Sequence, residues 1–467
     1  MEADSDMNRW KTVRIITGAI GVAMVATALV SALPEAPGRI EFLLVILGVT
    51  VIAAAILGSR AGAAYRSIAI IGLNTVMLFT VLEIGASLLL GVITRGRSKP
   101  DAEPRPAEVS LELSPFYADQ EWASRYWAEI AEQSATGWYH PYEFWRRAPF
   151  RGQLTNISLD GLRLTPGAKC QSGALVVYTF GGSGMWGVGV PDWGTIAAYL
   201  QAHWSRTESR PVCVVNFGQP GHTSTQGLIA LERELQRCKI PDLVVFYDSV
   251  NDLNYGRISG IPGAHRHLLE IALTLETGVP AWPSWVRSLS VLQLAREFMP
   301  KAAPRPHRYQ PRWNIAPDLA DGIAEVYLNN VRMVEALAVD YGFANAFFWQ
   351  PHIMMGKKPL TEAEKRILEA TEAGDGPIGR DGERAGHKLY RQVYASVARA
   401  AQSDDHLHDI SDVLDSVPSL VYLDSHHLTP DGNRRVAERM LQLIGDRIAI
   451  PGGSRPARAC HATPADR

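Results

Sequence analysis

Three side chains that lie far apart in the sequence have the types needed for acyl transfer: Ser183, His427 and Asp424. Such a reaction needs a nucleophile, a base that takes its proton, and a carboxylate that orients the base. Asp424 precedes His427 by three residues, so its carboxylate can reach the imidazole, and we predict His427 rather than the adjacent His426 as the base. Ser183 is the predicted nucleophile.

Acyl transfer also needs hydrogen-bond donors for the oxyanion that develops in the transition state. We predict that the backbone N–H groups of Ser183 and Gly221 and the side-chain amide of Asn251 form this oxyanion hole. Trp186 and His352 are weaker candidates for contact with the substrate, because a core position for the Trp and a structural role for the His are alternatives.

The predicted site residues follow apolar segments that are typical of buried parallel strands. The expected strands are Leu175–Phe180, Val212–Phe217, Leu243–Tyr247 and Ala344–Gln350, and Leu228–Cys238 and Ala324–Val339 are expected helices. This alternation predicts an α/β fold with a parallel sheet covered on both faces by helices. Ligand chemistry is then expected at the carboxyl ends of the strands, where the polar groups lie.

Two other motifs bear on cofactors and metal ions. Gly182, Gly184 and Gly187 fit the dinucleotide-binding pattern G-x-G-x-x-G, but the next strand ends in Asn216 and not in the acidic residue that would hold a ribose. The segment 404–409, DDHLHD, could ligate a metal ion, although a solvated polar loop is the commoner interpretation. We therefore predict neither a cofactor nor a metal ion.

Four blocks of the sequence, taken in order, resemble the SGNH (GDSL-type) hydrolases. The blocks are Gly181-Gly182-Ser183, Asn216–Gly227 with Gly221, Ser249-Val250-Asn251-Asp252, and Asp424–His427. The first block has Gly where the family usually has Asp, and the third has Ser where it usually has Gly. The resemblance covers about Tyr139 to Ile448. It implies a flavodoxin-like three-layer α/β/α sandwich and a serine hydrolase that acts on ester bonds.

The N-terminal region contains three long apolar runs, Ile15–Leu33, Phe42–Ser59 and Ser67–Thr94. The first two runs carry no charge, and the third carries only Glu83. Each run is long enough to cross a hydrocarbon core of about 30 Å. We therefore predict three N-terminal transmembrane helices, with Glu83 as a candidate intramembrane carboxylate.

Basic residues favour an N-terminus on the cytoplasmic side of this predicted anchor. Arg9, Lys11 and Arg14 precede the first run, whereas the loop after it carries only Arg39. Three crossings would then place the rest of the chain outside. The Gly-Gly-Ser block, the three-run anchor and the segment Tyr139–Thr165 further resemble membrane-tethered bacterial envelope members of the SGNH family that are associated with cell-surface polysaccharides. This resemblance implies the bacterial cytoplasmic membrane, with the catalytic domain facing the periplasm or the exterior.

Composition limits the domain organisation and the partners. We expect a membrane anchor over 1–95, a linker with an amphipathic helix over 96–138, a catalytic domain over 139–450 with insertions at 254–317 and 351–381, and a disordered tail over 451–467. The 46 basic and 48 acidic residues nearly balance, which argues against a nucleic-acid partner. One disulfide among Cys170, Cys213 and Cys238, or buried free thiols, are both open interpretations.

The function that the sequence favours is a membrane-anchored serine esterase or deacylase acting outside the cytoplasmic membrane on acyl esters, with O-acetyl groups of cell-surface glycans as candidate substrates. An O-acyltransferase that uses the same triad in exopolysaccharide modification is one alternative. A non-catalytic glycan-binding or scaffold protein of an export complex is another.

Overall fold

A computed structural model of the chain describes residues 74–87, 111–134, 137–269, 318–373 and 379–445, together with short pieces between 18 and 52 and at 89, 271–272, 289–292 and 294. The chain divides into two compact units. Unit 1 comprises Met1–Ala102 and Thr277–Arg305, and unit 2 comprises Glu103–Glu276 and Pro306–Arg467. All the predicted site residues lie in unit 2.

Unit 2 is built on a five-stranded parallel sheet. In spatial order its strands are β6 (Val212–Asn216), β5 (Leu175–Gly181), β7 (Leu243–Asp248), β8 (Ala344–Trp349) and β9 (Leu407–Asp409). Numbered along the chain, this is the order 2-1-3-4-5 of flavodoxin-like folds. The order reverses between β5 and β7, so the carboxyl ends of these two strands flank the point at which such sheets bind ligands.

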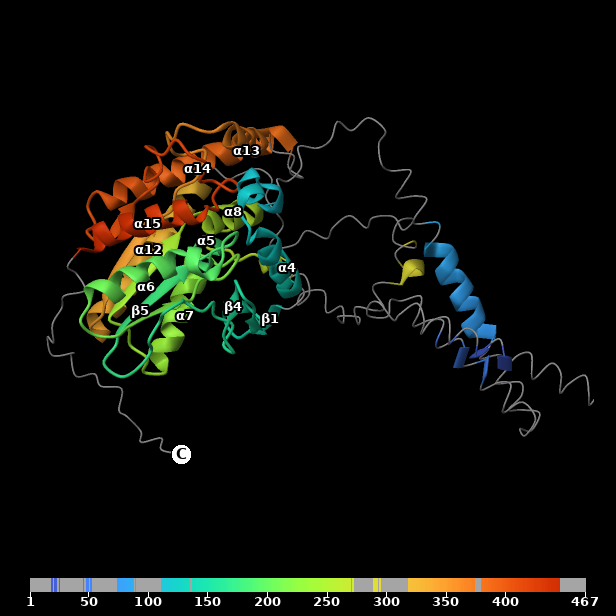
Figure 1. Cartoon of the computed structure of the whole chain (residues 1–467). Coiled ribbons are helices and arrows are strands. Elements are labelled where there is room, and N and C mark those ends of the chain that lie inside the picture. The colour runs from blue at the N-terminus through green and yellow to red at the C-terminus, as the bar shows by residue number, and fades with distance from the viewer. Residues whose placement is uncertain are drawn as a thin grey trace, which may run out of the picture. The chain divides into compact units, whose positions relative to one another are not determined.

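Helices cover both faces of the sheet, as the sequence predicts (Figure 1). One face is covered by α7 (Ser224–Gln236), α12 (Leu319–Tyr341) and α14 (Gly379–Ala401), and the other by α6 (Ile196–Thr207) and α15 (Pro430–Ile444). Alternation along β7 explains this: Val244 and Phe246 enter the first core, whereas Leu243, Val245 and Tyr247 enter the second. A strand buried on both faces must be apolar throughout, which gives the continuous apolar runs of the sequence.

Smaller elements surround the sheet. In the sequence, the first sheet strand is preceded by α4 (Ala123–Ser134), the hairpin of β1 (Gly137–His140) with β2 (Phe144–Arg147), and the pair β3 (Phe150–Arg151) and β4 (Asn156–Ile157). Three further helices follow β5, β7 and β8 in the sequence: α5 (Ser183–Trp186), α8 (Val250–Ser259) and α13 (Glu362–Ala373). Within the expected linker, where the amphipathic pattern covers Leu111–Ile130, the helix α4 begins only at Ala123, and 3₁₀ turns at Leu111–Leu113 and Pro115–Asp119 precede it. The expected tail, 451–467, lies outside the described residues.

The prediction of three N-terminal transmembrane helices is contradicted. In the parts of the chain that the structure describes, no helix is long and apolar enough to cross a membrane. The described part of the third apolar run is a helix over 74–87. Most of the first two runs lies outside the described residues.

Glu83 lies in that helix and is 5% exposed. Its carboxylate accepts hydrogen bonds from the backbone N–H groups of Ser290 and Val291, the second at 2.9 Å. These residues begin a short helical piece, and a carboxylate at a helix N-terminus is stabilised by the unpaired N–H groups there. Glu83 therefore has a structural partner within unit 1, drawn from the predicted insertion 254–317.

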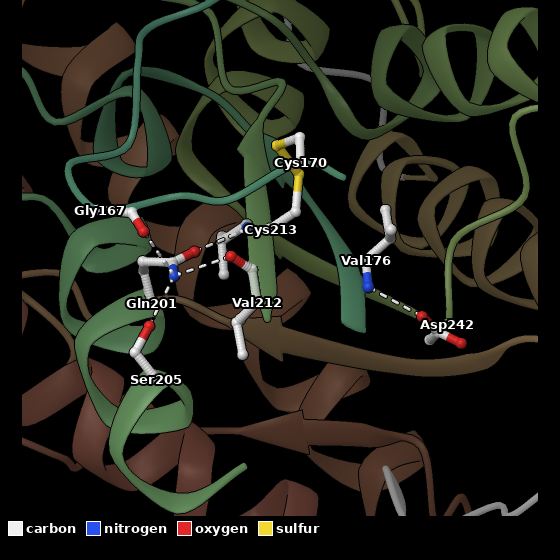
Figure 2. The surroundings of a disulfide bond; sticks show 9 residues. Gly167, Cys170, Val176, Gln201, Ser205, Val212, Cys213 and Asp242 are labelled. Carbon is white, nitrogen blue, oxygen red and sulfur yellow. Dashed lines mark hydrogen bonds between the residues drawn. A yellow bond between two sulfur atoms is a disulfide. The ribbon is translucent and has the colours of Figure 1, made fainter. Parts of the chain in front are cut away.

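The edge strand β6 is covered by side chains and by a disulfide between Cys170 and Cys213 (Figure 2). The Gln201 side chain on α6 donates to the carbonyl of Val212 at 3.1 Å and accepts from the N–H of Val214 at 2.8 Å. An uncovered edge would offer unpaired backbone groups to other chains. Of the two interpretations of the cysteines, the structure has the disulfide, and Cys238 is disulfide-bonded as well.

Replacing Cys170 and Cys213 together by alanine is expected to lower the free energy of unfolding by about 2–4 kcal/mol. The bond closes a loop with a sequence separation of 43, and without it the unfolded chain gains the conformational freedom of that loop. Urea unfolding measures this difference in the free energy of unfolding between the double variant and the oxidised parent. A midpoint unchanged both by the double substitution and by reduction of the parent would contradict it.

Candidate active site

Ser183 stands where β5 turns into α5. The turn depends on Gly181, whose φ of +149° is rarely adopted by residues with a side chain. A Cβ atom on Gly181 would lie 2.3 Å from the carbonyl oxygen of Tyr247 in β7, so the two strands approach too closely for any other residue. Ser183 is thereby placed at the carboxyl edge of the sheet, beside the point where the strand order reverses.

Ser183, His427 and Asp424 form a hydrogen-bonded row. The Ser183 Oγ atom is 2.7 Å from Nε2 of His427, and Nδ1 of the same ring is 2.6 Å from Oδ2 of Asp424. With the ring proton on Nδ1, the imidazole donates to the carboxylate and accepts the serine hydroxyl proton at Nε2. This is the arrangement that a nucleophile, a general base and its orienting acid require.

The carboxylate of Asp424 is held by more than the imidazole. Its Oδ1 atom accepts from the backbone N–H groups of His426 at 2.9 Å and His427 at 2.7 Å. Burial alone would raise the pKa of Asp424, but the neighbouring His427 and His426 and these hydrogen bonds hold it well below its usual range. Asp424 is therefore ionised and can stabilise the imidazolium that forms when His427 takes a proton.

Asn251 reaches the nucleophile from the first turn of α8. Its Nδ2 atom lies 2.2 Å from the position that a Cβ atom on Gly182 would occupy. The amide therefore lies against the backbone beside Ser183, and it donates to the carbonyl of His222 at 2.6 Å. A side chain at position 182 would therefore require the Asn251 amide to move from this place.

The structure also shows the backbone at Ser249, the other departure from the family pattern, and at Gly221, which matches it. Ser249, in the place of a family glycine, has a φ of 169°, which is extended backbone open to any residue, and its hydroxyl lies 3.2 Å from that of Tyr394. Gly221 has a φ of +85°, and so it provides the tight turn before His222. Gly221 is not among the residues that line the cavity at Ser183, whereas Asn251 is.

The cavity at Ser183 is small, at about 10 Å³, which is room for about one water molecule. His426 and Gln350 line it together with residues of the predicted oxyanion hole. The sequence analysis assigned neither of them to the site. Gln350 is a polar residue directly after β8, so its position at a strand end was the available signal.

Trp186 and His352 do not line this cavity. Trp186 is 1% exposed, because α5 ends within one turn and directs the ring into the protein under the guanidinium of Arg163, whose Cζ lies 4.3 Å from the ring centroid. His352 is 2% exposed, accepts at Nδ1 from the N–H of Met354, and lies with its ring parallel to that of His426. Both side chains support the site from within the core.

Arg163 is a residue that the sequence analysis missed. Its side chain is fully buried, and Nε pairs with Oδ1 of Asp192 at 2.9 Å. The other nitrogens donate to the carbonyls of Trp186, Gly187 and Val190, at 2.6–3.0 Å. One guanidinium thus holds the loop that leaves the nucleophile. An isolated Arg in a Gly-rich segment carries no periodic signal that would reveal this role.

Asp252 joins the two segments that carry the predicted oxyanion donors. Its carboxylate on α8 accepts from the hydroxyl of Ser224 at 2.5 Å and from the Ser224 N–H at 3.1 Å, at the start of α7. Burial raises the pKa of Asp252 to about 6. Burial and the nearby Asp252 raise the pKa of Asp248 well above its usual value. Asp252 therefore fixes Asn251 relative to the segment of Gly221.

Stability is expected to fall as the pH falls below about 6.5, because three imidazoles are buried in the neutral form. Burial lowers the pKa of His222 to about 3, of His352 to about 4 and of His426 to about 3. Each takes up a proton on unfolding below its unfolded pKa of about 6.5, so the stability it contributes is complete above that pH and is lost as the pH falls toward the folded pKa.

Together, the three imidazoles contribute a slope of about 4 kcal/mol per pH unit near pH 5. Asp252 and Asp248 act in the opposite sense, because their raised pKa values let the folded carboxyls hold protons that the unfolded ones release. Urea unfolding at several pH values between 7.5 and 4.5 measures the net slope. His352→Gln should lower the net slope by about 1.4 kcal/mol per pH unit near pH 5. A variant with the same slope as the parent would contradict the burial of the neutral His352 ring.

Two groups of side chains among the described residues lie close enough to share a metal ion. One is Asp424 with His426 and His427, and there the carboxylate and one ring already form the row with Ser183. The other group is Glu335 with Asp404 and His406, where Nδ1 of the imidazole lies 3.4 Å from the Glu335 carboxylate. The second group draws on the polar segment 404–409.

No protein-family model matches the sequence, and a search among curated proteins also finds no match. Solved structures do match. An acetyl xylan esterase is 14% identical with a TM-score of 0.31, covering 58% of this chain and all of its own length (100%). An acetylxylan esterase from Geobacillus stearothermophilus is 13% identical with a TM-score of 0.28, covering 59% of this chain and 96% of its own.

A third match is a member of the lipolytic protein G-D-S-L family from Veillonella parvula. It is 11% identical with a TM-score of 0.29, and the match covers 58% of this chain and 97% of that one. At such TM-scores, the chemistry of this chain has to be argued from its own residues. The structures that the comparison returns include esterases and a member of the lipolytic G-D-S-L family.

Proposed function

We propose that this protein is a serine hydrolase that cleaves ester bonds. The observation that supports the proposal is the row of Ser183, His427 and Asp424, with separations of 2.7 and 2.6 Å. Ser183 Oγ attacks the ester carbonyl while its proton passes to Nε2 of His427. The imidazolium then protonates the leaving alkoxide, and water hydrolyses the acyl-enzyme by the same proton transfers in reverse.

The acyl group is small in this proposal, with acetyl as the favoured case. The cavity at Ser183 has a volume of only about 10 Å³, and Gln350 and His426 are among the residues that enclose it. A Cβ atom on Gly184 would already lie 3.0 Å from the ring of Tyr247. A long acyl chain would have to displace packed side chains, which costs about 1–3 kcal/mol.

Labelling of the full-length protein with a fluorophosphonate, followed by mass-spectrometric mapping, tests the nucleophile and the reaction class together. Ser183 should carry the label, and Ser183→Ala should abolish it, whereas Ser403→Ala, at an exposed serine after α14, should not. In a series of p-nitrophenyl esters, kcat/KM should fall about 10- to 100-fold from acetate to octanoate. A folded protein that neither labels nor hydrolyses acetate would favour the non-catalytic scaffold.

The alternative to hydrolysis is transfer of the acyl group from Ser183 to a sugar hydroxyl. The same acyl-enzyme would then react with an added oligosaccharide faster than with water. Mass spectrometry of the oligosaccharide after incubation with p-nitrophenyl acetate distinguishes the two. Acetylated oligosaccharide that accumulates while release of free acetate falls would identify an O-acyltransferase.

We also propose that unit 2 works in an oxidising compartment outside the cytoplasm. The support is the disulfide of Cys170 with Cys213 and the disulfide-bonded state of Cys238, because such bonds persist mainly in oxidising compartments. Alkylation of thiols in intact cells with a mass-tagged maleimide, before and after reduction, tests it. Thiols that are reactive before reduction would refute this location.

A further inference from the structure

A second and larger cavity lies beside the β1–β2 hairpin, and we call it the hairpin cavity. Its volume is about 600 Å³, within the range of roughly 300–1,000 Å³ that is typical of small-molecule sites. β1, β6 and α7 supply part of its lining, and none of the lining residues also lines the cavity at Ser183. The hairpin cavity is therefore a separate feature of unit 2.

Large apolar side chains stand exposed at the hairpin cavity. Trp138 is 44% exposed, Tyr139 is 74% exposed and Leu159 is 83% exposed, and all three line the cavity. Exposed large apolar side chains grouped around a concave site mark a binding site for a ligand or a partner. The faces of aromatic rings are suited to the C–H faces of sugar rings, since both are flat and apolar while their edges are polar.

The wall of the hairpin cavity contains paired charges. Glu234 on α7 is 7% exposed, and its carboxylate accepts from Nη1 of Arg237 at 2.8 Å and lies 3.4 Å from Nζ of Lys239. Arg146, which also lines the cavity, is paired through two nitrogens with Glu143. Arg237 and Lys239 share the single carboxylate of Glu234, and Asp160 also lines the cavity. The acidic and basic groups therefore nearly balance, and the cavity has little net field to attract a polyanion.

The exposed side chains of Arg237 and Lys239 still have N–H donors that can bind a ligand. The side chains of Arg237 and Lys239 are 48% and 59% exposed, and a guanidinium and an ammonium each offer several N–H donors. Exposed rings and neutralised polar groups in one concavity match the chemistry of an uncharged carbohydrate. A nucleic acid or a uronate-rich chain would instead need unpaired positive charge.

We propose that the hairpin cavity binds a segment of a neutral glycan, with sugar rings against Trp138 and Tyr139 and hydroxyl groups hydrogen-bonded to Glu234, Arg237 and Lys239. This inference rests on the proposed function and gives its substrate class: O-acetyl esters carried on a neutral polysaccharide. The cavity would hold the chain, while the ester group reacts at Ser183.

The hairpin itself connects the two cavities. Trp145 on β2 pairs with Tyr139 in the hairpin register, and its Nε1 atom donates to the carbonyl of Pro220 at 3.0 Å, next to Gly221. The centroids of the Trp145 and His222 rings are 5.1 Å apart, and His222 lines the cavity at Ser183. A polysaccharide held at the hairpin cavity would raise the local concentration of its ester groups at the nucleophile.

The test compares Trp138→Ala with Tyr139→Ala, singly and together, in the full-length protein. Two substrates are used: acetylated xylan as a polymeric acetyl ester, and p-nitrophenyl acetate as an acetyl ester that carries no sugar. KM for acetylated xylan should rise by about tenfold in the double variant, as expected for the loss of two ring contacts. The kcat/KM for p-nitrophenyl acetate should stay within about twofold of the parent.

Tyr142→Ala is the matched control. Tyr142 is 63% exposed in the turn of the same hairpin, but it does not line the cavity, and its ring instead meets the guanidinium of Arg233, at 4.8 Å. This variant should leave KM for acetylated xylan unchanged. An equal rise in KM in Tyr142→Ala would mean that hairpin folding, and not the cavity, governs the effect, and it would overturn the inference.

Binding without turnover separates this inference from the proposed function. In affinity electrophoresis through gels that contain deacetylated xylan, glucomannan or hydroxyethylcellulose, the parent should be retarded by at least one polysaccharide, and the double variant should not. Retardation by a polysaccharide without any ester hydrolysis would contradict the proposed function and would still support the glycan site. Hydrolysis of p-nitrophenyl acetate by a parent that no polysaccharide retards would overturn the glycan site alone.

Discussion

Ser183→Ala is expected to lower kcat for p-nitrophenyl acetate by about 10⁶-fold, which is the scale of loss when a serine nucleophile is removed from a triad. The variant removes the atom 2.7 Å from His427 and leaves the imidazole without a hydroxyl to activate. Asp424→Asn should cost about 10⁴-fold, because an amide would favour the wrong tautomer of the ring. Initial rates with purified proteins, matched by circular dichroism, measure both.

The control for these variants is Ser403→Ala, which changes an exposed serine far from the row and should keep the parent's kcat. The double variant Ser183→Ala with His427→Ala should be no slower than Ser183→Ala alone, since the two residues act as one unit. Losses that multiply in the double variant, or a Ser183→Ala protein with parental activity, would remove the triad from the mechanism.

Asp192→Ala is expected to lower the free energy of unfolding by about 3–5 kcal/mol. The substitution leaves the fully buried guanidinium of Arg163 without its carboxylate partner, and a buried charge without a partner carries a large desolvation cost. The same substitution removes the acceptor for the side-chain amide of Asn156, at 3.0 Å. Urea unfolding at pH 7.5 gives the free-energy difference from the parent.

Glu438→Gln supplies the comparison for Asp192→Ala. Glu438 pairs with Arg434 on the outer side of α15 at 2.6 Å, but both side chains are about half exposed. Exposed pairs contribute about 0.2–1 kcal/mol, so this variant should unfold almost as the parent does. If Asp192→Ala cost no more than Glu438→Gln, the buried pair would not be what holds the loop after Ser183.

The residues of the triad could be identified from the sequence because each of them lies in a short local pattern. Asp424 and His427 are three residues apart, and Ser183 follows an apolar strand and a pair of glycines. The parallel sheet was predictable for a similar reason, since strands buried on both faces leave continuous apolar runs. What joins these segments in space is the order of the strands, which no single block encodes.

Other parts depended on contacts between segments distant in the sequence. Arg163 and Asp192 form a buried pair across 29 positions, and neither lies in a recognisable pattern. Trp186 was a plausible substrate contact beside Ser183, but a helix as short as α5 turns it into the core. The apolar run at 67–94 has the composition of a membrane span, yet no helix in the described part of the chain is long and apolar enough to be one.

The division of the chain has a practical consequence for truncation. Thr277–Arg305 belongs to the same compact unit as Met1–Ala102, and Glu83 binds the backbone of Ser290 and Val291 within it. Deleting the first 102 residues would therefore remove Glu83, whose carboxylate binds the backbone of an internal segment that stays in the chain. A shortened version that keeps only unit 2 should also replace Thr277–Arg305 by a short polar loop.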